Sequence, residues 1–261
     1  MASSFQVAIN IDQSLWSSFE NIKVRGFAFF CDEYYEGIGL AKLIYSHGFY
    51  HQTDSIIEKL NGMFAVISVQ ETNVFLATDI TRTYPIFYLK SESRVLISDS
   101  TSKFNIESKN YVLRETIDEY LSAGFVTGNK TLLSGVEQVE AAEIVMISRP
   151  GIFAQEYWTY ATGQVFDKKF DEYQNELNSI LSNVADRLVV SLNNRTAVIP
   201  LSGGYDSRLI LLLLIERRYE NIICFSYGSK SSFEMKYAKL TAKKLNIKFI
   251  DIQYDQKFVD K

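Results

Sequence analysis

The sequence predicts two domains: an α+β domain of layered antiparallel sheets with helices over residues 1–165, and an α/β parallel sheet over residues 166–261. Three observations lead to this prediction. The 261 residues exceed one typical domain of about 150 residues. Hydrophobic residues make up 47% of the chain, which is enough to build a core. Short paired apolar runs give way, after a small polar segment at 161–167, to alternating strands and helices.

The first half contains apolar runs that pair across short polar segments, as β-hairpins do. One hairpin is expected from Met63–Val69 and Val74–Asp79, and a second from Ile86–Leu89 and Val95–Asp99. Several short antiparallel strands with helices favour a layered α+β domain. Further strands are expected at Gln6–Ile11, Val24–Cys31 and Gly151–Tyr157, and a further strand pair at Val136–Val139 and Ile144–Ile147.

Helices are expected at Ile38–His47 and Asp54–Leu60, where Asp54 can cap the second helix and Asn61-Gly62 supplies a stop. Thr116 and Glu119 fit a capping box that opens a short helix ending at Gly124. These helices complete the first domain.

The second half alternates strands with helices. Apolar residues from Phe170 to Leu188 recur with a period near 3.6, which predicts an amphipathic helix lying on the second domain. Strands are expected around Val198-Ile199, at Asn221–Tyr227 and at Ile247–Ile252, and the intervening helices join them as right-handed crossovers of a parallel sheet. Ligands of such sheets bind at the C-terminal ends of the strands.

The segment from Leu201 to Arg208 reads Leu-Ser-Gly-Gly-Tyr-Asp-Ser-Arg, between a strand and an apolar helix expected to be packed on both sides. Paired glycines allow positive φ and a close approach to a ligand, and Asp206 and Ser207 are good helix-capping types. Backbone N–H groups before a helix N-terminus favour phosphate or pyrophosphate. The spacing is neither that of the Walker loop nor Gly-x-Gly-x-x-Gly. The alternative is an ordinary strand-to-helix turn.

This segment resembles the pyrophosphate loop of the N-type ATP pyrophosphatases, which include the asparagine synthetases. Upstream segments resemble asparagine synthetase patterns in the same order along the chain. They are Gly62–Ile67, Leu76–Asp79, Tyr84–Tyr88, Val95–Asp99 and Thr131–Val139, followed by Tyr157-Trp158. The resemblance therefore runs from about residue 60 to the end.

The resemblance implies an N-terminal class II glutamine amidotransferase-like domain with the Ntn-hydrolase-like fold, then the first part of an α/β parallel-sheet nucleotide-binding domain. It assigns ATP and Mg²⁺ as cofactors. Asp206 would hold Mg²⁺ and, with Arg208, act in catalysis; a helix cap and a solvated arginine are the plainer alternatives. Leu201 and Tyr227 would meet the adenosine. The β- and γ-phosphates would lie against Ser202, Gly203, Gly204 and Ser207.

Two departures from the family pattern stand out. The family's glutaminase uses an N-terminal cysteine, but position 2 is Ala2, followed by Ser3 and Ser4, and Cys31 lies inside an expected strand. We therefore expect a glutaminase-dead domain. The chain also ends before the family's downstream acidic signature. It is expected to be either a fragment or half of a split enzyme completed by a partner chain or a homo-oligomer.

Composition excludes several classes of function. The net charge of −4 gives no electrostatic case for nucleic acid or anionic membranes. Cys31 and Cys224 lie in apolar surroundings and are expected to be buried free thiols, and the N-terminus does not read as a signal peptide. We expect a cytoplasmic protein. His47 and His51 make no metal site.

The function expected from these residues is an ATP-dependent amide ligase. It would adenylate a small carboxylate substrate, release pyrophosphate, and transfer ammonia or an amine to give an amide and AMP. The alternative is a non-catalytic nucleotide-binding or scaffold protein, or one half of a split synthetase.

Overall fold

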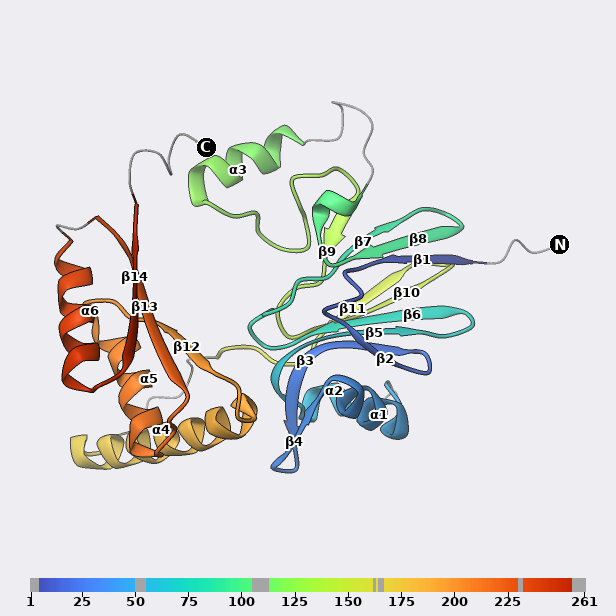
Figure 1. Cartoon of the computed structure of the whole chain (residues 1–261). Coiled ribbons are helices and arrows are strands. Elements are labelled where there is room, and N and C mark those ends of the chain that lie inside the picture. Colours follow the sequence, from blue (N-terminus) through green and yellow to red (C-terminus); the bar gives the residue numbers. More distant parts are fainter. Residues whose placement is uncertain are drawn as a thin grey trace. The chain divides into compact units, whose positions relative to one another are not determined.

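The computed structural model describes residues 5–49, 55–104, 113–161, 163, 167–229 and 232–254. The chain divides into two compact units, Met1–Gly163 (unit 1) and Gln164–Lys261 (unit 2), shown in Figure 1. Each unit has its own sheets and its own core, and each is described separately.

The larger sheet of unit 1 has seven strands in the order β11-β10-β6-β5-β3-β2, and its pairs are antiparallel. Strand β4 pairs with the later part of β3, on the same edge as β2 and opposite β5. Val69 lies opposite Val74 in the β5–β6 hairpin, which confirms the first predicted hairpin. The strands are β2 (Ser17–Phe19), β3 (Ile22–Phe30), β4 (Glu33–Glu36), β5 (Asn61–Val69), β6 (Asn73–Thr78), β10 (Glu143–Ser148) and β11 (Ile152–Glu156).

The smaller sheet of unit 1 has the order β1-β8-β7-β9, built from β1 (Gln6–Asn10), β7 (Phe87–Lys90), β8 (Arg94–Ser98) and β9 (Val136–Gln138). The β7–β8 hairpin confirms the second predicted hairpin. Strand β1 runs parallel to β8, so this edge pair is an exception in the predicted layers of antiparallel strands.

The predicted pairing of β9 with β10 is also wrong. Strand β9 pairs with β7, whereas β10 lies between β6 and β11 in the other sheet. The chain changes sheets between them: the Val139 N–H donates to Ile86 O, and the Ala142 N–H donates to Asp79 O. Two adjacent apolar strands therefore serve different layers, which local sequence does not specify.

Unit 1 has three layers, because strand β5 buries side chains on both of its faces. Ala65 and Ile67 pack into a core between the two sheets. Phe64 and Val66 point to the opposite face, as the two-residue period of a strand requires. There they meet helices α1 (Gly37–His47) and α2 (Ile56–Lys59), which cover the outer face of the larger sheet (Figure 1).

The helix ends of unit 1 correct several predictions. Ser55 caps α2 by accepting the Ile57 N–H at 3.2 Å, and the predicted cap Asp54 lies outside the described residues. Helix α2 ends at Lys59, and Asn61-Gly62, the predicted stop of this helix, forms the first two residues of β5.

Helix α3 (Arg114–Ala123) does not begin with the predicted capping box. Thr116 lies inside its first turn and donates to Leu113 O at 2.9 Å, and no side chain caps the helix. Gly124 ends α3 in the left-handed region with φ 82°, which confirms the predicted stop. A short 3₁₀ turn, η1 (Thr101–Lys103), precedes α3 in the chain.

Unit 2 contains the predicted parallel sheet, in the order β12-β13-β14. Helices α5 and α6 pack on one face, where Leu211 and Ala238 meet Ile199 and Cys224. The C-terminal part of α4 joins the same core. The elements are α4 (Phe170–Leu192), β12 (Ala197–Pro200), α5 (Tyr205–Glu216), β13 (Ile222–Gly228), α6 (Phe233–Lys244) and β14 (Lys248–Gln253).

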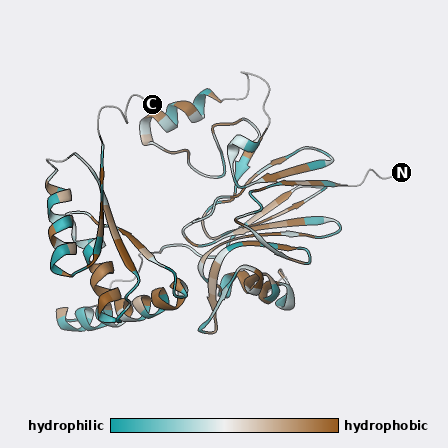
Figure 2. Cartoon of the chain, in the orientation of Figure 1, coloured by the Kyte–Doolittle hydropathy of each residue, from teal (hydrophilic) through white to brown (hydrophobic). Residues whose placement is uncertain are grey.

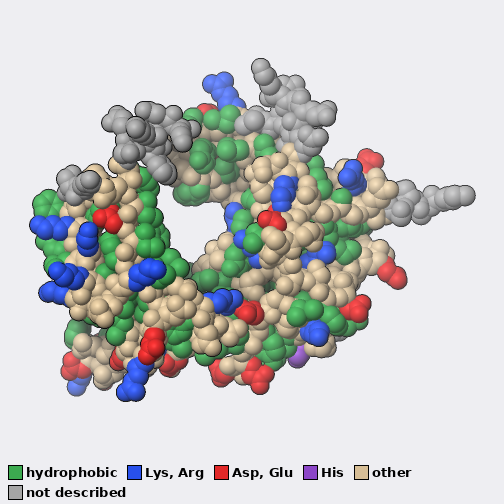
Figure 3. Space-filling view, viewed as in Figure 1, with side chains coloured by type: hydrophobic (Ala, Val, Ile, Leu, Met, Phe, Trp, Pro, Cys, Tyr) green, Lys and Arg blue, Asp and Glu red, His purple; other side chains and the backbone are tan. Residues whose placement is uncertain are grey.

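Much of the apolar surface of unit 2 is exposed. Val198, Tyr227 and Ile250 lie on the sheet face opposite the helices, and Val198 is 59% exposed. Leu209, Ile210 and Leu212 on α5 are also exposed, so the prediction that this helix is packed on both sides is wrong. Hydrophobic side chains are visible on the surface beside β13 and β14 in Figure 3.

Helix α4 has the predicted amphipathic period but buries only part of it. Ala185 and Ser191 are buried, whereas the stripe from Phe170 through Leu177 to Val184 is exposed. Figure 2 shows hydrophobic residues along α4 and α5. Only the C-terminal half of α4 therefore lies on the core of unit 2.

Two further sequence predictions are resolved by the fold. Cys224 is buried, and burial raises its pKa, but Cys31 is exposed in the turn between β3 and β4 with φ 50°. The expectation of two buried thiols is wrong for Cys31, because β3 ends one residue earlier. No helix in the described ranges is long and apolar enough to cross a bilayer. On the face seen in Figure 3, basic and acidic side chains are interspersed.

Candidate functional site

The candidate site begins where β12 ends. The Leu201 N–H donates to Phe225 O at 2.8 Å, continuing the pairing of β12 with β13 by one residue. Its side chain is 1% exposed and belongs to the core of unit 2. Any contact of Leu201 with a ligand must therefore come from its backbone.

The loop after Leu201 is closed by serine hydroxyls. The Ser207 Oγ accepts the Ser202 N–H at 3.2 Å and lies 3.2 Å from the Ser202 Oγ. The Ser202 Oγ in turn accepts the Gly204 N–H at 3.1 Å. These contacts tie the loop to the first turn of α5, so the two predicted phosphate-binding serines lie together.

Neither glycine of this loop adopts a left-handed backbone conformation, but Gly203 leaves space for a neighbouring segment. Gly203 and Gly204 are absent from the positive-φ residues, and Gly204 has φ −75° and ψ 174°, so neither uses the positive φ that glycine allows. A Cβ on Gly203 would lie 3.3 Å from the Glu234 Cα in the first turn of α6. The close approach of the two segments therefore explains the glycine at 203.

Helix α5 begins at Tyr205 with no side-chain cap. Gly204 occupies the N-cap position, and Asp206 and Ser207 are the second and third helical residues, so the prediction that they cap the helix is wrong. The first-turn N–H groups of Tyr205, Asp206 and Ser207 have no intrahelical acceptors. An uncapped helix N-terminus with its positive dipole end favours an anion.

Arg208 folds back over the loop. Its Nε donates to Gly204 O at 2.7 Å, and its Nη2 donates to Gly203 O at 3.0 Å. Its guanidinium also lies over the Tyr205 ring, 4.7 Å from the centroid. These contacts do not fit a merely solvated arginine.

Asp206 is exposed in the first turn of α5. Among the residues that the structure describes, no group of three or more His, Cys, Asp and Glu side chains could hold a metal ion. One carboxylate suits Mg²⁺, which is commonly held by one or two carboxylates together with substrate phosphates. The donor set at the loop therefore fits Mg²⁺ that arrives with a nucleotide.

The end of β13 supplies the other predicted site residue. Tyr227 is 59% exposed, and its ring lies 5.7 Å from that of Tyr254, just beyond β14. Sequence reasoning left Glu234 out of the site, yet α6 brings it against Gly203. The signal available was its position: Glu234 follows β13 in a first helical turn, as Asp206 follows β12.

Two family descriptions match different parts of the chain. Residues 45–158 match the glutamine amidotransferase domain, and residues 196–260 match the queuosine biosynthesis protein QueC. The chain is therefore similar to a class II glutamine amidotransferase domain followed by a partial N-type ATP pyrophosphatase segment. The first match lies in unit 1 and the second in unit 2, which confirms the predicted resemblance and the order of the two folds.

Among curated proteins, the chain is similar to the microcin J25-processing protein McjC of Escherichia coli, with 24% identity over 213 residues. That match covers 79% of this chain and 39% of McjC. The chain therefore spans about two fifths of the length of this relative.

Among solved structures, the chain resembles the glutamine PRPP amidotransferase of B. subtilis, with TM-score 0.32 and 13% identity, covering 94% of this chain and 51% of that one. It also resembles a structure described as the allosteric regulatory enzyme of purine biosynthesis, with TM-score 0.33 and 13% identity, covering 95% and 51%.

Proposed function

We propose that this chain forms part of an ATP-dependent amide ligase. A substrate carboxylate attacks the α-phosphorus of ATP, and pyrophosphate leaves. Ammonia or an amine then attacks the acyl-adenylate, giving an amide and AMP. The observation that carries the proposal is the Ser202–Arg208 loop, whose hydroxyls and uncapped helix N-terminus converge after a parallel strand.

In this proposal Arg208 positions the loop. Carbonyl oxygens carry partial negative charge and would repel a phosphate. By donating to Gly203 O and Gly204 O, Arg208 holds these oxygens on its own side. The peptide bond is planar and trans, so the N–H of Tyr205 points the opposite way from Gly204 O. The arrangement directs this N–H toward an anion.

The remaining roles follow from the chemistry of the reaction. Charge builds on the leaving pyrophosphate, and the hydroxyls of Ser202 and Ser207 with the helix N–H groups stabilise it. Asp206 would hold Mg²⁺, which neutralises phosphate charge when bound. Tyr227 and the Leu201 backbone would meet the adenosine.

Unit 1 serves as a glutaminase-dead domain in this proposal. The sequence has two cysteines, Cys31 and Cys224. Cys31 lies on the exposed β3–β4 turn, with peptide bonds on both sides, and Cys224 is buried in unit 2. Neither has the free α-amino group that an N-terminal nucleophile uses as its base. The nitrogen would then come from ammonia or an amine; release of glutamate from glutamine by the purified chain would contradict this.

The relative's name favours a processing reaction on another molecule over asparagine synthesis, because McjC is named for processing microcin J25. The second candidate function is a non-catalytic nucleotide-binding scaffold, or half of a split synthetase. The exposed apolar sheet face of unit 2 supports it, since such a face is suited to a partner.

ATP–pyrophosphate exchange separates these candidates. The full chain with Mg²⁺ is tested with L-aspartate and with short peptides bearing free carboxylates. Exchange that depends on the carboxylate and is lost in Ser207→Ala, but kept in the control Ser179→Ala on exposed α4, supports the ligase. ATP binding without exchange supports the scaffold. A folded chain that does not bind ATP contradicts both.

A further inference from the structure

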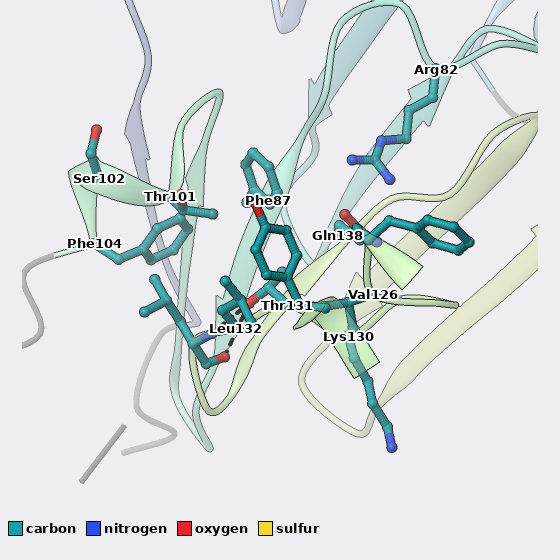
Figure 4. A pocket seen from close by; sticks show the side chains of 14 residues that line it. Arg82, Phe87, Thr101, Ser102, Phe104, Val126, Lys130, Thr131, Leu132 and Gln138 are labelled. Atoms are coloured by element: carbon teal, nitrogen blue, oxygen red, sulfur yellow. Dashed lines mark hydrogen bonds between the residues drawn. The ribbon is translucent and has the colours of Figure 1, made fainter. Parts of the chain in front are cut away.

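Unit 1 contains a cavity of about 740 Å³ that the proposed ligase chemistry does not use. Its lining residues come from β7, η1, α3 and the segment after α3. Figure 4 shows several of them, including Phe87, Phe104 and Leu132. This volume is within the range of sites for small organic ligands. Its walls are mostly apolar and aromatic, and include Phe87, Phe104, Tyr120, Phe125, Leu132 and Leu133.

Two of these aromatic side chains are poorly covered. Tyr120 is 47% exposed and Phe125 is 59% exposed, although both line the cavity. Exposed aromatic surface that is gathered in a concavity marks a binding site more often than does scattered exposure. The ligand should therefore have an apolar body.

The walls are held in place by buried and partly buried hydrogen bonds. The Thr131 Oγ donates to Val136 O at 2.8 Å and accepts the Leu133 N–H at 3.1 Å. The Gln138 Nε2 donates to Gly128 O at 2.7 Å. The cavity is consequently bounded by fixed segments.

Arg82 places a positive charge at this cavity. It also lines an adjoining cavity of about 500 Å³, so its side chain stands where the two spaces meet. Burial lowers the pKa of Arg82, and the charge of Glu140 opposes that effect; an arginine remains charged at neutral pH. Within the described ranges, no hydrogen bond or ion pair of its guanidinium is present. Figure 4 shows the guanidinium pointing toward Gln138, whereas Lys130 points away from the Phe87 ring.

The turn that presents Arg82 is organised by Asp79. This buried carboxylate accepts the N–H groups of Phe64, Thr81 and Thr83 at 2.8 to 3.1 Å. Its oxygens accept from neutral N–H and hydroxyl donors, and within the described ranges no ion pair joins them to Arg82. Arg82 itself has φ 52°, a left-handed conformation that glycine would adopt without strain. This left-handed turn presents the Arg82 side chain beside the residues that line the cavity.

From these features we infer that the cavity of unit 1 binds an apolar monocarboxylate, with the Arg82 guanidinium holding the carboxylate and the aromatic walls holding the apolar body. One guanidinium matches one carboxylate in charge and can bind it through two parallel hydrogen bonds. Binding here requires no ATP, so it holds whether or not unit 2 adenylates a substrate.

The test measures direct binding to the full chain without nucleotide, by calorimetry. The probes are N-acetyl-Phe-Phe as the free acid, the same peptide as its C-terminal amide, and decanoate. We expect the peptide acid to bind at least about tenfold more tightly than the amide. Arg82→Gln should remove this difference, while the matched control Lys130→Gln should keep it. Stronger binding of decanoate than of the peptide would identify a fatty acid as the ligand type.

A second variant separates binding from folding. Arg82→Gly relieves the left-handed strain, so it should bind no better than Arg82→Gln while its Tm stays equal to or above that of the original chain. Equal binding of acid and amide, unchanged binding in Arg82→Gln, or no binding of either acid by the folded chain would overturn the inference. Loss of ATP binding by unit 2 would leave this inference intact, because binding in the cavity of unit 1 needs no nucleotide.

Discussion

The two units treat their sheets differently. Unit 1 covers both faces of its seven-stranded sheet, with helices on one side and the second sheet on the other, so Ile67 is fully buried. Unit 2 covers one face of its three-stranded sheet and leaves Val198 on the other 59% exposed. The better-packed unit is the one proposed to lack its family's chemistry. The unit that carries the proposed phosphate-binding loop leaves an apolar sheet face exposed.

The largest expected effect compares these two side chains. Ile67→Ala should lower the free energy of unfolding of unit 1 by about 3 kcal/mol, because it leaves a cavity between two sheets. Val198→Ala should change the free energy of unfolding of unit 2 by no more than about 0.5 kcal/mol, because the side chain is exposed. Urea titration follows unit 1 by tryptophan fluorescence, since Trp16 and Trp158 both lie there. Helical circular dichroism reports both units, so the unfolding of unit 2 is the part of that signal that does not follow the tryptophan transition. Similar costs at both sites would mean that the exposed sheet face is covered in solution.

A pair of glycines sharpens the comparison. In Gly203→Ala the new Cβ lies against the Glu234 backbone. We therefore expect the free energy of unfolding of unit 2 to fall by about 1–3 kcal/mol, and ATP binding to weaken. In Gly39→Ala the new Cβ on helix α1 meets nothing within 4 Å, so unit 1 should gain up to about 1 kcal/mol. Thermal unfolding and titration with a fluorescent ATP analogue measure both. An unaffected Gly203→Ala variant would show that the loop and α6 do not approach closely.

Removing the arginine that braces the loop should have a moderate effect. Arg208→Gln loses two hydrogen bonds to loop carbonyls, and we expect ATP affinity to fall about tenfold with little change in the helical content of unit 2. The control is Arg218→Gln, beyond the C-terminal end of the same helix. Titration with the fluorescent ATP analogue measures the affinity of both variants. A similar loss of affinity in both would show that net charge, not loop geometry, is responsible.

The smallest effect concerns pH and unit 1. Burial alone would raise the pKa of Asp99, but hydrogen bonds from Lys103, the Asp12 backbone and the Trp16 indole outweigh it and lower that pKa. The stabilisation is therefore complete above the ordinary pKa of about 4 and is lost as the pH falls toward the lowered value. Asp99→Asn should flatten the acid side of the stability curve measured by tryptophan fluorescence, whereas Glu71→Gln in the β5–β6 turn should not.

Several elements could be predicted because they depend on neighbours in sequence. The β5–β6 hairpin follows from two apolar runs and a short polar turn, and the three parallel strands of unit 2 follow from their alternation with helices. The Ser202–Ser207 motif also predicts a phosphate-binding loop; the structure shows that its two serine hydroxyls lie together, and phosphate binding stays a prediction. What local sequence could not show is which partner each strand takes, as the separation of β9 from β10 demonstrates.

The sequence by itself determined the two fold types, their order, and the residues of the candidate loop. Tertiary structure decided what surrounds them. The space at Gly203 depends on α6, 30 residues further along, and the cavity of unit 1 joins Arg82, Phe104, Phe125 and Gln138 from separate segments. The α4 period predicted a helix, but only packing decided that its C-terminal half is covered and its N-terminal stripe is not. Periodicity records which side chains are apolar; burial depends on what the rest of the chain places against them.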